Sequence, residues 1–119
     1  MTVTRINPEY VKPYAAGDSI SGNVYTAGYI TSGTREVCFS IPLSRPLNRS
    51  VTVTYMGLIA RQNNSYPVGS GSAYQNVTQY TRAMVTANYL YFSVTFPSAL
   101  SAQNNSAVGV QAEYNISVN

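Results

Sequence analysis

The feature that most constrains the fold is a period-two alternation of apolar and polar side chains. It is clearest in residues 35–56, where two alternating runs are separated by a short polar stretch. The apolar positions of the two runs are Val37, Phe39, Ile41 and Leu43, then Val51, Val53 and Tyr55. This period puts one set of side chains on each face of a strand, so two strands of one sheet are predicted. Pro42 and Pro46 lack backbone donors, so residues 42–49 are predicted to be a loop.

Two later segments alternate as clearly. Residues 89–96 bring Leu90, Phe92, Val94 and Phe96 to one face, and Pro97 ends the run. Residues 107–118 form the longest alternating run, with apolar side chains from Val108 to Val118 on one face. A strand this long needs partners along its length, so we expect it to be central in its sheet.

The remaining segments are predicted from composition. Residues 23–30 are rich in Val, Tyr and Thr and predict a strand, followed by a turn at residues 31–34. Gly57 interrupts the second run, so residues 58–61 are expected to continue it after a bulge. Residues 62–72 have the Asn, Pro, Ser and Gly content of a loop. Residues 73–87 fit one or two strands joined by an irregular step.

These segments predict an all-β fold with little helix, because no stretch carries sustained helical periodicity with caps. Long connections and the lack of Asn-Gly or Asp-Gly turns favour an antiparallel β-sandwich of the jelly-roll or Greek-key type over a meander. Residues 1–22, with two prolines and two glycines, are expected to be an extended lead-in segment, and residues 23–119 the β-sandwich domain.

The scarcity of charge narrows the possible functions. Only 9% of the residues are charged, against about 25% in a typical globular protein. The net charge of +3 comes from basic residues scattered along the chain, so we expect no nucleic-acid partner. No apolar run is long enough to span a bilayer, and no membrane insertion is expected.

Catalysis is not expected. The chain has no histidine, and its four acidic residues are Glu9, Asp18, Glu36 and Glu113. Glu36 and Glu113 are the one pair that could meet at a glycosidase-like separation, but ion pairing or exposure is the favoured interpretation. Cys38, the single cysteine, is expected to pack as a small apolar side chain. The composition offers no metal site and no cofactor motif.

Eleven tyrosines and many Asn, Ser and Gly residues are the compositional signal that bears on function. Tyrosine combines a rigid apolar ring with a hydroxyl group, which suits recognition surfaces and stacking on sugars. The alternative is that these tyrosines fill strand faces or a subunit interface. The expected ligand-binding residues are Arg61, Asn63, Asn64, Tyr66, Tyr74 and Tyr80.

The order of several motifs resembles a known family. They are G-D-S-I-S-G (17–22), A-G-Y-I-T-S-G-T (27–34), V-C-F-S-I-P-L-S-R-P-L (37–47), I-A-R-Q-N (59–63) and N-N-S-A-V-G-V (104–110). Together they resemble C-terminal domains of tail-fibre and minor structural proteins from phages and prophages of Gram-positive, gut-type bacteria. The resemblance implies a trimeric β-sandwich head at a fibre tip, in the virion, that binds a host-surface glycan or protein outside the cell.

Three functions remain as alternatives. The first is a non-enzymatic receptor-binding head of a phage tail fibre. The second is a structural virion module, such as a capsid decoration or a fibre spacer. The third is a carbohydrate-binding module of a secreted bacterial protein. The apolar residues on both faces of residues 89–96 add a further expectation, a homo-oligomer and specifically a homotrimer.

Overall fold

The computed structural model describes residues 11–31, 34–86, 88–98, 100 and 106–119. Its strands are β1 (Ser19–Thr31), β2 (Glu36–Pro42), β3 (Val51–Gln62), β4 (Ser65–Val68), β5 (Gln75–Asn76), β6 (Thr81–Val85), β7 (Tyr89–Thr95) and β8 (Ser106–Val118). A single 3₁₀ turn, η1 (Thr78–Tyr80), is the helical content of the described residues. The expected all-β fold with little helix is confirmed.

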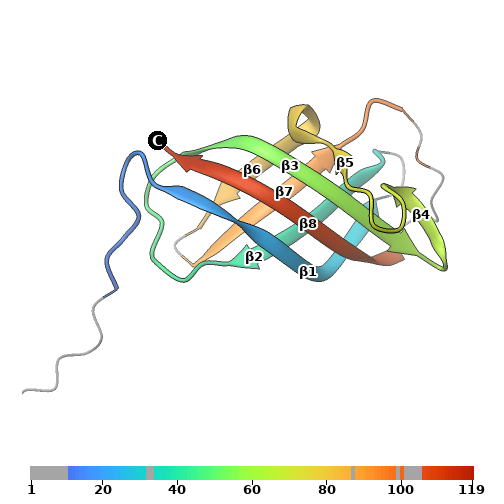
Figure 1. The fold of residues 1–119 in the computed structure, drawn as a ribbon, viewed down its shortest axis with the longest axis horizontal. Helices are drawn as coiled ribbons and strands as arrows, with labels where there is room; N and C mark the ends of the chain where they lie inside the picture. Colours follow the sequence, from blue (N-terminus) through green and yellow to red (C-terminus); the bar gives the residue numbers. More distant parts are fainter. Residues whose placement is uncertain (1–10, 32–33, 87, 99, 101–105) are drawn as a thin grey trace, which may run out of the picture.

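All eight strands belong to one antiparallel sheet that curls into a half-barrel (Figure 1). The strand order is β4-β3-β8-β1-β2-β7-β6, with β5 pairing on β3. In Figure 1, β3, β8 and β1 pass in front of β2, β7 and β6. The rings of Phe92 on β7 and Tyr114 on β8 meet across the interior with centroids 6.3 Å apart. β3 and β6 approach each other where the curl nearly closes.

The core lies inside this curl, and the alternation of the sequence explains it. The inward-facing rows of three strands are buried, namely Val37, Phe39 and Ile41 on β2, Leu90, Phe92 and Val94 on β7, and Val108, Val110, Ala112, Ile116 and Val118 on β8. β8 lies between β3 and β1, which confirms the expected central position of the C-terminal strand.

β3 differs from the prediction in where it bulges and in how it is covered. The register shift lies between Val53 and Tyr55, and the strand runs unbroken through Gly57. Residues 56–60 are all buried, because β5 pairs with this part of β3 and the segment before β5 lies over its outer face, with Tyr74 at Gly57 and Gly69 at Ile59. A Cβ at Gly57 would lie 3.1 Å from the Cβ of Tyr74 and closer still to the Tyr55 hydroxyl. Gly57 therefore permits this close covering and does not mark a bulge.

The predicted loop at residues 62–72 contains a strand, β4, which forms a tight hairpin with β3. Gln62 pairs with Ser65, and the two residues between them, Asn63 and Asn64, have positive φ angles of 48° and 64°. A type I′ hairpin turn requires positive φ at both central positions, and asparagine tolerates this conformation better than most residues. Asn-Asn thus replaces the Asn-Gly signal on which the prediction relied.

The boundary of the lead-in segment is shifted towards the N-terminus. β1 begins at Ser19, so residues 19–22 of the expected lead-in belong to the first strand, while residues 1–10 lie outside the described residues. Arg45 fastens the preceding residues to the β2–β3 connection. It donates to the carbonyls of Lys12 (2.7 Å) and Pro13 (2.9 Å), and it pairs with Asp18 at 3.5 Å.

Two consecutive residues of β8 test the orientation of the strand. Ile116 is fully buried, so Ile116→Ala should lower the free energy of unfolding by about 2–5 kcal/mol. Asn115 is exposed on the opposite face, so Asn115→Ala should change it by less than about 0.5 kcal/mol. Urea denaturation followed by circular dichroism measures both values. Equal losses would contradict the assigned faces.

Candidate functional site

Five polar and aromatic residues gather on the outer face of β1, β8, β3 and β4. This group, called the Arg61 cluster below, consists of Tyr25, Arg61, Asn64, Tyr66 and Gln111. Strand pairing sets its layout: Tyr25 on β1 pairs with Gln111 on β8, and Arg61 on β3 pairs with Gly109 on β8. Most of these side chains surround a cleft of about 110 Å³, and Gly109 also lines it.

Neutral partners hold the Arg61 side chain. Its Nη2 donates a hydrogen bond of 2.7 Å to Oδ1 of Asn64, and its guanidinium carbon lies 5.9 Å from the centre of the Tyr66 ring. Asn64 sits in the β3–β4 turn, and Tyr66 follows on β4, so the hairpin places both partners. The guanidinium group is thereby oriented without its charge being neutralised.

The structure brings together three of the six residues expected to bind a ligand. Arg61, Asn64 and Tyr66 are in contact, and Asn63 adjoins them in the same turn. The other two lie elsewhere. Tyr74 is half-buried beside Gly57, and Tyr80 packs its ring on Phe96 with centroids 5.8 Å apart.

Sequence reasoning missed Tyr25 and Gln111. Tyr25 is 76% exposed, yet its segment alternates imperfectly and gave no reason to single it out. Gln111 was assigned correctly to the polar face of the last strand. Both reach Arg61 only because β8 pairs with β1 on one side and with β3 on the other, over separations of more than 35 residues in sequence. No pattern within a single segment of the sequence predicts that Tyr25 and Gln111 lie near Arg61.

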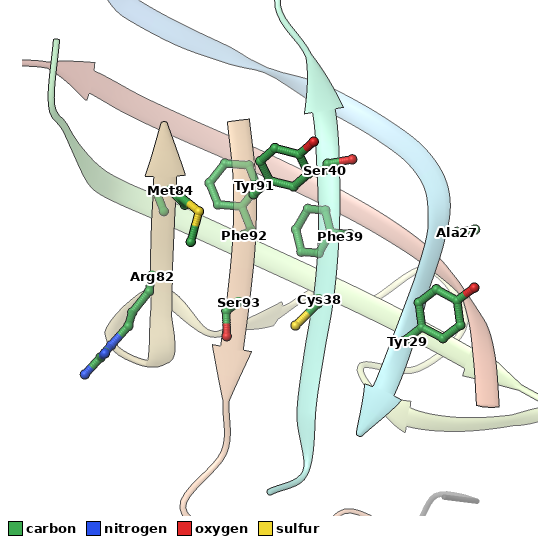
Figure 2. A pocket seen from close by; sticks show the side chains of 11 residues that line it. Ala27, Tyr29, Cys38, Phe39, Ser40, Arg82, Met84, Tyr91, Phe92 and Ser93 are labelled. Carbon is green, nitrogen blue, oxygen red and sulfur yellow. The ribbon is translucent and has the colours of Figure 1, made fainter. Parts of the chain in front are cut away.

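A second surface feature lies on the outer face of β1, β2, β7 and β6, and is called the β2–β7 hollow below. Its volume is about 680 Å³. Figure 2 shows Met84 and Tyr91 at one end of the hollow and Tyr29 at the other, with Ser93 on β7 and Cys38 on β2 between the two ends. Met84 is 67% and Tyr29 61% exposed. Most of the exposed lining of the hollow is apolar, and its polar groups come from Ser40, Arg82, Ser93 and the hydroxyls of Tyr29 and Tyr91.

Glu36 and Cys38 form a small polar network beside the hollow. Glu36 accepts hydrogen bonds from Ser93 (2.7 Å), Thr95 (3.3 Å) and the Cys38 thiol (3.1 Å). The bonds from Ser93 and then Cys38 hold the pKa of Glu36 below its ordinary value. Burial, together with the nearby Glu36, raises the pKa of Cys38 to about 11. A thiol with so high a pKa is a poor nucleophile at neutral pH.

The structure separates the two carboxylates that could have formed a glycosidase pair. Glu36 is opposite Thr31 of β1, and Glu113 is opposite Asn23 of the same strand. These positions are eight residues apart along the strand, a span of roughly 26 Å at about 3.3 Å per residue. Glycosidase carboxylates lie about 5–9.5 Å apart, so these two do not form such a pair.

Comparison of the chain with protein-family models, with curated proteins and with solved structures finds no match. Among the described residues, no three His, Cys, Asp or Glu side chains gather in a way that could hold a metal ion. The same part of the chain contains no helix long and apolar enough to cross a bilayer. Function must therefore be inferred from the two surfaces themselves.

The Glu36 network predicts a specific dependence of stability on pH. Because the folded-state pKa of Glu36 is lowered, its carboxylate stabilises the fold above its ordinary pKa of 4.5, and this contribution is lost as the pH falls through the folded-state value. Glu36→Gln should be less stable than the wild type at pH 7, with a difference that shrinks between about pH 5 and pH 3. Urea titrations across this range measure it, and Glu113→Gln controls for the loss of one negative charge. A difference independent of pH would contradict the network.

Proposed function

We propose that this chain is a non-enzymatic binding domain at the tip of a phage tail fibre, and that it attaches to glycans of the host cell surface. The observation that carries the proposal is the Arg61 cluster, where two exposed tyrosines flank an arginine and two amide side chains around a cleft. The tail-fibre setting, in the virion and outside the cell, comes from the motif resemblance described above.

The chemistry of the cluster suits a sugar. The C–H face of a sugar ring packs on an aromatic ring, while its hydroxyl groups exchange hydrogen bonds with amide and guanidinium groups. Tyr25 and Tyr66 supply rings, and Arg61 and Gln111 supply donors. The cleft is small, about 110 Å³, so it fits one side of a sugar unit at the surface of a larger polymer. The β2–β7 hollow is larger, but most of its exposed lining is apolar, so it would pair fewer of the hydroxyl groups of a sugar.

We assign the β2–β7 hollow to self-association, with a homotrimer as the proposed state. Met84, Tyr29, Tyr89 and Tyr91 are all exposed on β1, β6 and β7. Clustered apolar residues of this kind, in a chain with few charges, are typical of interfaces between subunits. The occupant that the composition favours is a second copy of this chain, because the surface around the hollow has few charges to recognise an unlike partner.

The finer assignment of the fold is also a proposal. The connections from β2 to β3 and from β7 to β8 each pass over two strands of the sheet. Connections that skip strands distinguish Greek-key folds from meanders, and this supports placing the half-barrel with the jelly-roll or Greek-key sandwiches.

The proposal predicts binding to cell walls through the cluster. The purified domain should co-sediment with walls of Gram-positive host bacteria and with polysaccharide released from them. Tyr25→Ala and Tyr66→Ala should each weaken binding by about three- to tenfold, the effect of losing one aromatic contact. Tyr14→Ala, which removes a tyrosine from the segment before β1 that lines neither the cleft nor the hollow, serves as the matched control.

The outcome separates the three functions. A structural virion module would bind no polysaccharide and would tolerate all three substitutions. A module from a secreted enzyme would bind as a monomer, and its parent gene would encode a catalytic domain. A tail-fibre head should be encoded near tail or lysis genes.

The proposed trimer predicts that a charged substitution in the hollow lowers the molecular mass measured in solution. Light scattering at micromolar concentration should give three times the monomer mass for the wild type. Met84→Lys places a charge on the apolar surface and should shift the protein to the monomer, since an unpaired buried charge is strongly unfavourable. Gln79→Lys adds the same charge on exposed η1 and should leave the mass unchanged. A wild-type monomer would contradict the assignment.

A further inference from the structure

The charge balance of the Arg61 cluster indicates what kind of sugar it would take. Within the described part of the chain, no carboxylate forms an ion pair with Arg61. The nearest acid along the sheet is Glu113, which pairs with Gly57 on β3, four residues from Arg61. That is roughly 13 Å at about 3.3 Å per residue, beyond a direct contact and more than a Debye length at physiological ionic strength.

The other well-anchored arginines of the structure are used differently. Arg45 pairs with Asp18 and donates to two carbonyls, and Arg49 donates to the carbonyl of Asn119 at 2.6 Å. These contacts fasten one chain segment to another. Arg61 instead donates to a single side-chain amide within its own hairpin. That contact orients the guanidinium group, which carries five N–H donors, and uses few of them.

The surroundings of Arg61 favour a ligand that combines an acid with a ring. Tyr66 lies against the guanidinium group, and Tyr25 stands on the far side of Gly109. Because Gly109 has no side chain, the end of the Tyr25 ring lies over its backbone, where a Cβ would come within 2.9 Å of the Tyr25 hydroxyl, and both residues line the same cleft as Arg61. A ring stacked on Tyr25 would therefore place its substituents within reach of Arg61 and Gln111.

We propose that the Arg61 cluster binds an anionic sugar unit, one that bears a carboxylate or a phosphate group. The acid group accepts two hydrogen bonds from the Arg61 guanidinium, the sugar ring packs on Tyr25, and Gln111 hydrogen-bonds to ring hydroxyls. Guanidinium groups match carboxylate and phosphate oxygens in this two-bond geometry, and the bonds are stronger than those to neutral hydroxyls. This inference rests on the proposed glycan-binding function and names the ligand class of the same cluster.

The test uses polymers that differ in the acid group. The carboxylate arm is polygalacturonate, and its methyl ester is the matched neutral polymer with the same sugar. The phosphate arm is a poly(glycerol phosphate) bearing sugar substituents, compared with the sugar alone. Isothermal titration calorimetry at 50 and 300 mM salt should show tighter binding to at least one acidic polymer than to its neutral partner. The expected preference is about 10- to 100-fold at low salt, and it should decrease at high salt.

The variants ask whether Arg61 causes this preference. Arg61→Gln should bind acidic and neutral polymers equally, while Arg61→Lys should keep part of the preference because it retains the charge without the planar fork. Lys12→Gln removes one exposed positive charge from the segment before β1, away from the cluster, and should keep the full preference. Thermal denaturation verifies that each variant is folded.

Two results would overturn the inference, and they have different consequences for the glycan-binding proposal. Equal binding of acidic and neutral polymers by the wild type would rule out the anionic class and leave the glycan-binding proposal intact. If the domain bound neither these polymers nor host cell walls, the glycan-binding proposal would fail as well. A preference in only one arm supports the inference and identifies the acid group.

Discussion

The inward-facing row of β8 is the contact on which the rest of the structure depends. β8 pairs along nearly its whole length with both β1 and β3, and its buried side chains run from Val108 to Val118. Tyr114, in the same row, reaches Phe92 on the opposite wall of the half-barrel. The Arg61 cluster is a consequence of this arrangement, since Tyr25 and Arg61 face each other only because β8 lies between their strands. Packing inside the barrel thus fixes the geometry of the surface outside it.

Two tyrosines of this charge-poor chain lie over glycines of neighbouring strands. A Cβ at Gly22 would come within 3.2 Å of the Tyr114 hydroxyl, and one at Gly109 within 2.9 Å of the Tyr25 hydroxyl. Each tyrosine covers backbone that a glycine leaves bare, and its hydroxyl provides a polar group. Tyr114 does this in the interior, where burial raises its pKa. Tyr25 does it on the surface, and its ring remains available to a ligand. The same residue type therefore serves packing at one position and the proposed recognition at another.

How much of the fold the sequence could predict depends on whether each strand is buried on one face or on both. The strands buried on one face, β2, β7 and β8, were predicted because a single buried face leaves a period-two pattern. Residues 56–60 of β3 are covered on both faces, which removes the pattern. The β3–β4 hairpin was missed because Asn63 and Asn64 take positive φ angles that were expected only of Asn-Gly or Asp-Gly. Arg61, Asn64 and Tyr66 could be grouped from the sequence because they are close along the chain, and the structure brings them into contact. The positions of Tyr25 and Gln111 depend on pairing between distant strands. Tyr80 lies apart from the Arg61 cluster, because composition does not distinguish a ring that packs on Phe96 from one that faces solvent.

The two surfaces have complementary properties, and their positions matter for attachment. A cleft of about 110 Å³ contacts only one side of a sugar unit, so the affinity of one site is expected to be low. The β2–β7 hollow lies on β1, β2, β7 and β6, whereas the Arg61 cluster lies over β1, β8, β3 and β4 (Figures 1 and 2). The two surfaces share the outer face of β1, where Tyr25 lines the cleft and Ala27 and Tyr29 line the hollow, but their other strands differ, so self-association through β2, β7 and β6 would leave Arg61 and Tyr66 open to solvent. A polymer that repeats the same unit could then occupy several clusters at once, and the second and third contacts would form at a high effective concentration. Under the proposed function, weak single sites and self-association through the hollow would act together to hold a repetitive surface.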